Sequence, residues 1–183
     1  IERLQAGGRW NEAGECLAAA ARALVAAGAE FLVLCTNTMH KVAPAIEAAA
    51  GIPLLHIADA TAEAVRSAGI RRIGLLGTRF TMEQDFYRGR LESAHGLQVL
   101  VPDDAERTVV HEVIYNELCL GVINESSRVA YRDIIRRLVA QGAEGIILGC
   151  TEIGMLVSPA DSPVPVFDTT AIHASGAVEY CLS

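Results

Sequence analysis

Two short polar segments of this 183-residue sequence follow hydrophobic runs and contain side chains that can move a proton. The first is Thr36-Asn-Thr-Met-His40 and the second is Gly149-Cys-Thr-Glu152. A thiol donates a proton and a thiolate accepts one, and a helix N-terminus lowers the free thiol pKa of ~8.5, so both forms are reachable near neutral pH. Removing a proton from a carbon next to a carboxylate requires a base on one face and a donor on the other. Cys150 is the residue that we expect to move this proton.

An internal repeat relates the two segments. Leu24-Val-Ala-Ala-Gly-Ala-Glu30 returns as Leu138-Val-Ala-Gln-Gly-Ala-Glu144, and a hydrophobic run and a polar turn follow each copy. Superposing the copies gives three pairs, Thr36 with Cys150, Asn37 with Thr151 and Thr38 with Glu152. In open α/β sheets, ligands bind beyond the carboxyl ends of the strands. If the two halves face each other, Thr36 and Cys150 approach one ligand from opposite sides, so we expect both to be catalytic.

Hydrophobic runs alternate with helical periodicity along the chain. The expected strands are 31–35, 54–57, 73–76, 146–148 and 164–167, and the expected helices include 15–27 and 126–141. Gly28 and Gly142 are placed to end these two helices. The alternation predicts an α/β fold with two pseudosymmetric lobes, each with a mainly parallel sheet flanked by helices and with the active site in the cleft between them. We expect residues 1–62 and 168–183 in the first lobe and residues 63–167 in the second.

The second half has an opening strand, Arg72-Ile-Gly-Leu-Leu-Gly-Thr78, for which the first half shows no counterpart. Because a βαβ unit otherwise starts without its first strand, we expect that an N-terminal strand and its loop, ~40 to 50 residues, are missing from this chain. A naturally short first lobe is the alternative.

Composition favours a small-molecule partner. The net charge is -7 and no long basic cluster is present, which argues against nucleic-acid binding. No run of about 20 apolar residues predicts a membrane span. The five cysteines are far apart and show no CxxC spacing, so neither a metal site nor a redox pair is indicated. Reduced cysteines fit a cytoplasmic protein.

The two segments, together with Val166-Phe-Asp-Thr-Thr-Ala-Ile-His173, resemble the signatures of the aspartate/glutamate racemase family, which works without pyridoxal phosphate. The resemblance covers essentially the whole chain. It is closest to the bacterial branch of broad-specificity or L-aspartate/glutamate-specific racemases, which Leu76-Gly-Thr-Arg-Phe-Thr-Met-Glu-Gln-Asp-Phe-Tyr-Arg88 also matches. The resemblance implies an isomerase that moves a proton at the α-carbon of an amino acid, without cofactor or metal, as a homodimer.

The resemblance and the repeat together suggest further site residues. Asn37, Thr38 and Thr151 look like ligands of the amino and carboxylate groups of the substrate, and Glu152 is expected to tune or relay protons for Cys150. The loop with Thr78 and Thr81 is expected to contact the substrate side chain.

One position departs from the family pattern. Where cysteine usually precedes Asn-Thr, this chain has Thr36, and the cysteine lies one place earlier, at Cys35. Since neighbouring strand residues point to opposite faces, we expect Cys35 to face the core. A threonine hydroxyl is a poor base, so we expect racemisation with unequal faces or slow turnover.

Simpler structural roles compete with several of these assignments. Cys150 could be a core cysteine, Thr36 a helix N-cap, and Glu152 a first-turn carboxylate that favours the helix dipole. Three histidines could relay protons, although capping or core roles are favoured for them: His40, His56 and His173. Asp168 is expected to cap the last helix. The cysteines other than Cys150 are expected to be packing residues.

Two other functional interpretations stay open. Hydantoin racemase, arylmalonate decarboxylase and maleate isomerase chemistry use related scaffolds, and decarboxylation needs only one cysteine. An amino-acid-binding protein without turnover would also fit the presence of Thr36 in place of cysteine.

Overall fold

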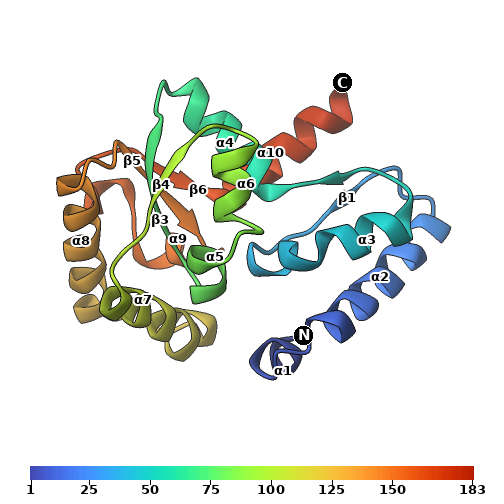
Figure 1. Ribbon diagram of the computed structural model, residues 1–183, viewed down its shortest axis with the longest axis horizontal. Helices are drawn as coiled ribbons and strands as arrows, with labels where there is room; N and C mark the ends of the chain where they lie inside the picture. Colours follow the sequence, from blue (N-terminus) through green and yellow to red (C-terminus); the bar gives the residue numbers. More distant parts are fainter.

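The computed structural model describes residues 1–183 and contains two separate parallel sheets (Figure 1). The elements around the first sheet are α1 (Glu2–Ala6), α2 (Trp10–Ala26), β1 (Leu32–Val33), the 3-10 helix η1 (Thr38–Val42), α3 (Ala43–Ala50) and β2 (Leu54–Leu55). Strands β1 and β2 pair in parallel, with Leu32 opposite Leu54. Gly28 has a φ of 95° just beyond α2, a left-handed conformation that glycine adopts without steric cost.

The second sheet has four strands in the order β4-β3-β5-β6, all parallel. Its elements are α4 (Ile57–Ser67), β3 (Arg72–Gly77), α5 (Arg79–Glu83), α6 (Arg88–Ser93), β4 (Gln98–Leu100), α7 (Asp104–Asn116), η2 (Leu118–Leu120), α8 (Glu125–Ala140), β5 (Gly145–Gly149), α9 (Ile153–Leu156), η3 (Pro159–Asp161), β6 (Val166–Asp168) and α10 (Thr169–Leu182). Gly142, with a φ of 102°, lies beyond α8 as Gly28 lies beyond α2.

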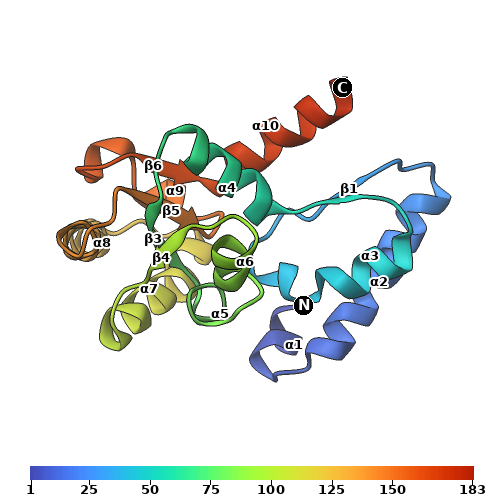
Figure 2. The same ribbon diagram turned by 45° about the horizontal axis from the view of Figure 1, so that its top comes forward.

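Helices cover the larger sheet. Helices α7 and α8 pack against β3, whereas α10 packs against β5, β6 and α4 (Figures 1 and 2). The larger hydrophobic core contains 29 buried residues and the smaller one nine, so most of the buried apolar surface stabilises the four-stranded part. Ile57, Ala58 and Val65 of α4 belong to the larger core.

The predicted architecture of two lobes with parallel sheets flanked by helices is confirmed. All five expected strands exist, although β1 and β2 are shorter than expected and Ile57 begins a helix instead of ending a strand. Strand β4 was not predicted, because three residues are too few to show a clear alternation. The residue boundaries proposed for the lobes, 1–62 with 168–183 and 63–167, stay a prediction.

No helix of the structure is both long enough and apolar enough to cross a lipid bilayer.

Candidate active site

A cavity of about 660 Å³ lies beyond the carboxyl ends of β1, β3 and β5. Seven of the eight predicted site residues line it: Thr36, Asn37, Thr38, Thr78, Cys150, Thr151 and Glu152. Thr36 comes from the two-stranded part and Cys150 from the four-stranded part, so both halves of the repeat contribute to one cavity. This location agrees with the rule that open α/β sheets bind ligands at the carboxyl ends of their strands.

Cys150 follows β5 directly and forms a hydrogen bond with Glu152, two residues further along the chain. Its Sγ donates to Oε2 of Glu152 at 2.9 Å, and Oγ1 of Thr151 donates to the same oxygen at 2.6 Å. Cys150 is half-buried and lines the cavity, so it is not an ordinary core cysteine. The carboxylate of Glu152 therefore lies within proton-transfer distance of the thiol.

The electrostatic surroundings favour the thiol form of Cys150. Burial raises the pKa of the Cys150 thiol, and the neighbouring Glu152 carboxylate raises it further. Burial also acts to raise the pKa of Glu152, but the hydrogen bonds from Cys150 and Thr151 outweigh it, and the net pKa lies below its ordinary value. The lowered thiol pKa expected from a helix N-terminus is therefore wrong, since α9 has only four residues and Glu152 supplies a negative charge. In this state the pair is a thiol and a carboxylate.

Thr36 lines the cavity from the two-stranded part and does not cap a helix. The N-cap of η1 is Asn37, without a side-chain cap, and the Thr36 carbonyl accepts a hydrogen bond from Nδ1 of His40 at 2.7 Å. The competing N-cap interpretation of Thr36 is therefore wrong.

Cys35 does not face the core. It is exposed and lines the same cavity. The expectation of burial was wrong because β1 ends at Val33, so strand alternation does not extend to Cys35. Cys16, Cys119 and Cys181 are exposed too, which corrects the packing role expected for them.

Asn37 has an unused acceptor. Its Nδ2 donates to Oγ1 of Thr169 at 3.0 Å, and that hydroxyl donates to the carbonyl of Leu148 at 2.9 Å. The Oδ1 of Asn37 is buried and has no hydrogen-bond partner, although Asn37 lines the cavity. A buried oxygen without a partner is unusual in a folded protein, and it leaves Asn37 with one free acceptor beside the cavity.

Three threonine hydroxyls connect η1 of the two-stranded part with the start of α5 in the four-stranded part. Oγ1 of Thr38 lies 3.0 Å from Oγ1 of Thr78, which lies 3.2 Å from Oγ1 of Thr81. Thr78 also caps α5 by accepting a hydrogen bond from the backbone N–H of Thr81. Thr81 is completely buried and does not line the cavity. The structure thus places Thr81 behind Thr78 as a support, because the helical turn of α5 directs its side chain inward.

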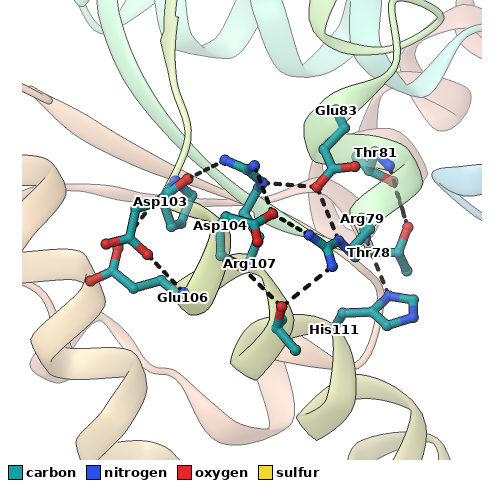
Figure 3. Close-up of polar contacts among 11 residues, drawn as sticks. Thr78, Arg79, Thr81, Glu83, Asp103, Asp104, Glu106, Arg107 and His111 are labelled. Carbon is teal, nitrogen blue, oxygen red and sulfur yellow. Dashed lines mark hydrogen bonds and ion pairs between the residues drawn. The ribbon is translucent and has the colours of Figure 1, made fainter.

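An ion-pair network fastens the loop after β3 to α7 (Figure 3). The guanidinium group of Arg79 pairs with Glu83 and Asp104, and Arg107 pairs with both carboxylates as well. The backbone N–H of Arg79 donates to Nδ1 of His111 at 3.2 Å (Figure 3). These contacts hold the residue next to Thr78 from two sides, so they fix where the Thr78 hydroxyl lies.

Glycines allow β3 and β5 to end side by side at the cavity. Gly77 and Gly149 are register partners. A Cβ atom added to Gly149 would lie 2.8 Å from the carbonyl oxygen of Leu76, and one added to Gly77 would lie 2.9 Å from that of Gly149. Both distances are too short, and both involve backbone atoms, which cannot rotate away.

We therefore expect Gly149→Ala to lower the free energy of unfolding by about 1 to 3 kcal/mol and to displace Cys150. Urea unfolding would measure the loss. Gly176→Ala in α10 is the matched control, because its added Cβ meets only the Cβ of Ala60 in α4, at 3.7 Å. Equal stability of the two variants would contradict the steric argument.

Several cavity residues were not predicted from the sequence. Met39, Cys119 and Leu120 line the cavity, as do Gln5 of α1 and Tyr115 of α7. The Nε2 of Gln5 donates to Sδ of Met39 at 2.8 Å, and the Tyr115 hydroxyl donates to Oε1 of Gln5 at 3.4 Å. No local pattern marks these residues, since only the packing of α1 and α7 brings them to the cavity.

The three histidines have structural partners. His40 and His173 bond to backbone groups, and His56 caps α4 by accepting from the N–H of Ala58 at 3.2 Å. Asp168 caps α10, as predicted. No group of three or more His, Cys, Asp or Glu side chains is arranged to hold a metal ion.

The sequence of this chain is similar to that of known racemases. A family model described as Asp/Glu/Hydantoin racemase matches residues 1–177. The chain belongs to the Asp/Glu/hydantoin racemase family. This match confirms the expected family. It also confirms the expected enzyme class, an isomerase that acts on amino acids.

Relatives of the racemase family match most of the chain. A Yersinia pestis protein assigned as an Asp/Glu racemase has 62% identity and a TM-score of 0.93, covering 100% of this chain and 80% of that chain. An aspartate racemase homologue from Pyrococcus horikoshii OT3 has 36% identity and a TM-score of 0.83, and the match covers 95% of this chain and 76% of that chain. The broad-specificity amino-acid racemase RacX of Bacillus subtilis (strain 168) is 24% identical over 160 residues, which cover 85% of this chain and 66% of RacX.

Proposed function

We propose that this member of the racemase family inverts amino acids at the α-carbon without pyridoxal phosphate, with Cys150 as a proton-transfer residue. The main support is the hydrogen bond of 2.9 Å between the Cys150 thiol and the Glu152 carboxylate, in one cavity with Thr36. A thiol next to a proton acceptor on one wall, with a hydroxyl on the other, suits a 1,1-proton transfer.

Cys150 acts on one face of the substrate. Its proton passes to Glu152, and the thiolate then takes the α-proton, which leaves the bonding electron pair on the carbon. Backbone N–H groups after Thr36 and Cys150, with the hydroxyls of Thr38 and Thr151, bind the carboxylate and stabilise the negative charge. Oriented donors of this kind contribute roughly 3 kcal/mol each in acyl-transfer enzymes.

Thr36 serves the other face. Its hydroxyl delivers a proton to the carbanion and recovers one from solvent, whereas the reverse step requires Thr36 to act as a base. A hydroxyl does this poorly, so the enantiomer whose α-proton faces Cys150 reacts faster. Asn37, which lines the cavity, is the proposed ligand of the substrate amino group.

The charged residues that line the cavity affect which substrate side chain it accepts. The residues of this chain that line the cavity include Glu2 and Glu152 but no lysine, arginine or histidine. Two carboxylates disfavour a third negative charge nearby. We therefore propose that amino acids with uncharged polar side chains, such as homoserine, react faster than aspartate or glutamate, with Gln5 and Tyr115 as the donors that meet this side chain.

Replacing Gln5 with arginine is expected to raise the ratio of kcat/KM for L-aspartate to that for L-homoserine by roughly tenfold, because a cation at this wall attracts the side-chain carboxylate. Gln5→Met is the matched control, since it keeps the length of the side chain without the charge. An unchanged ratio in Gln5→Arg would show that the substrate side chain does not approach Gln5.

The test of the proposed function is α-proton exchange. The protein is incubated in deuterium oxide with L-aspartate, L-glutamate and L-homoserine, and NMR follows exchange while chiral chromatography follows the D-enantiomer. Exchange with inversion supports the racemase. Parallel trials with hydantoins, arylmalonates and maleate cover the related chemistries, and ligand binding without any exchange would favour an amino-acid-binding protein.

We further propose that the protein is cytoplasmic, homodimeric and independent of nucleic acids, with a small amino acid as its partner. The net charge of -7 and the five free cysteines support the absence of nucleic acid and the reducing compartment. Light scattering of the purified protein would measure the dimer directly.

A further inference from the structure

Three buried histidines form a cluster, and one of them bonds to Thr36. His40 belongs to η1, His56 follows β2 and His173 belongs to α10, and they are 2%, 7% and 3% exposed. The ring centroids of His40 and His56 are 4.2 Å apart, and those of His40 and His173 are 6.1 Å apart. The cluster joins three elements and contacts the site through the bond from His40 to the Thr36 carbonyl.

Hydrogen bonds determine which nitrogen of His40 has the proton. The Thr36 carbonyl can only accept, so Nδ1 of His40 has the proton and donates it at 2.7 Å. Nε2 accepts from the backbone N–H of Ile57 at 3.2 Å. Both nitrogens are occupied, so His40 has no free site for relaying a proton. It instead ties the Thr36 carbonyl to the first residue of α4.

Ile57, the second partner of His40, lies in a well-packed part of the structure. Ile57 is 1% exposed and belongs to the larger core. His173 donates from Nε2 to the carbonyl of Leu55 at 2.8 Å, which fixes the end of β2. Thr36, in contrast, lies three residues beyond the end of β1 and receives no support from the strand ladder.

We propose that His40 is a positioning residue: it sets the place of Thr36 opposite Cys150 and thereby controls proton transfer on the Thr36 face of the substrate. This inference rests on the proposed function. A displacement of about 1 Å of a reacting group can cost roughly a hundredfold in rate. Cys150 and Glu152 receive no hydrogen bond from His40, since they are held by β5 and Thr151.

The two faces can be separated experimentally. Starting from the enantiomer whose α-proton faces Cys150, exchange with retention needs only the Cys150 face, whereas inversion also needs a proton from the Thr36 face. The ratio of inversion to exchange therefore reports on Thr36 alone. A general structural defect would lower both rates together and leave the ratio unchanged.

Two variants divide the hydrogen bonds of His40. In His40→Asn the amide nitrogen replaces Nδ1 and keeps the donor to Thr36. In His40→Gln the longer amide reaches the position of Nε2 and keeps the contact with Ile57 only. Both variants and Thr36→Val, as a reference, are incubated with L- and D-homoserine in deuterium oxide, and circular dichroism verifies their folding.

We expect His40→Gln to lower the inversion-to-exchange ratio roughly a hundredfold, as Thr36→Val does, while exchange itself changes by no more than about threefold. His40→Asn should keep the ratio within a fewfold of the unmodified protein. A parallel loss of exchange and inversion, or an unchanged ratio in His40→Gln, would overturn the inference and leave the racemase proposal intact. Absence of exchange in the unmodified protein would overturn both.

Discussion

Replacing Cys150 with serine is expected to lower the rate of α-proton exchange roughly 10³-fold, because a hydroxyl is a much weaker acid and its anion is not accessible near neutral pH. Exchange should be lost on the Cys150 face, and with it inversion. NMR in deuterium oxide measures the rate, and Cys181→Ser is the matched control, since Cys181 is exposed in α10 and does not line the cavity.

Replacing Glu152, whose carboxylate accepts the Cys150 hydrogen bond, should also lower the rate of α-proton exchange. Glu152→Gln removes the acceptor of the Cys150 proton, so we expect the rate to fall roughly a hundredfold with little change in KM. The same variant removes a negative charge that raises the pKa of Cys150. The pH at which the remaining activity rises should therefore be lower than in the unmodified protein. Full activity of either variant would exclude the pair from the reaction.

The folded state is expected to lose stability as the pH falls from about 6.5 toward 4. Burial lowers the pKa of His40 from 6.5 to about 4 and that of His56 to about 3. Between these values and 6.5, the unfolded chain binds protons that the folded chain excludes, so the free energy of unfolding decreases with decreasing pH. Above 6.5 both states are neutral at these rings and the stabilisation is complete.

The size of this loss follows from the shift. Each unit of pKa corresponds to about 1.4 kcal/mol, so His40 alone accounts for about 3 kcal/mol, reached near pH 4. Asp59, whose pKa is lowered to about 2 by its contacts with Arg90 and His95 against the opposing effect of burial, adds its own loss only at lower pH. The two contributions therefore fall in different pH ranges.

A single substitution isolates the histidine contribution. His56→Asn keeps an acceptor for the Ala58 N–H that caps α4, while it removes one titrating group. We expect the slope of unfolding free energy against pH between about 4 and 6 to decrease by up to about 1.4 kcal/mol per pH unit. The charged groups that act on His56 are Arg90, Asp59 and the other two histidines, and all of them remain in this variant. An unchanged slope would mean that His56 does not titrate differently on unfolding.

Much of the architecture could be predicted from local patterns. The strands and helices, the glycines after α2 and α8, and the cap at Asp168 follow from periodicity and terminal residues within short windows. The repeat placed Thr36 and Cys150 at equivalent turns, and the structure brings both to one cavity. These features depend on contacts close in sequence or on symmetry between two similar segments.

Other features depend on where strands end and on residues far apart in the chain. Cys35 faces the cavity because β1 stops at Val33, and Thr81 lies buried because α5 turns it away, neither of which periodicity indicates. Gln5 and Tyr115, 110 positions apart, meet only through tertiary packing.

The sequence by itself therefore determined the fold class, the family and the proton-transfer turns, since each is written in short motifs. The tertiary structure decided how those turns are supported and charged. Burial and Glu152 keep Cys150 as a thiol, and His40 bonds both to the Thr36 carbonyl and to the N–H of Ile57, which lies 17 positions beyond His40. Such effects arise from desolvation and long-range hydrogen bonds, which exist only once the chain is packed.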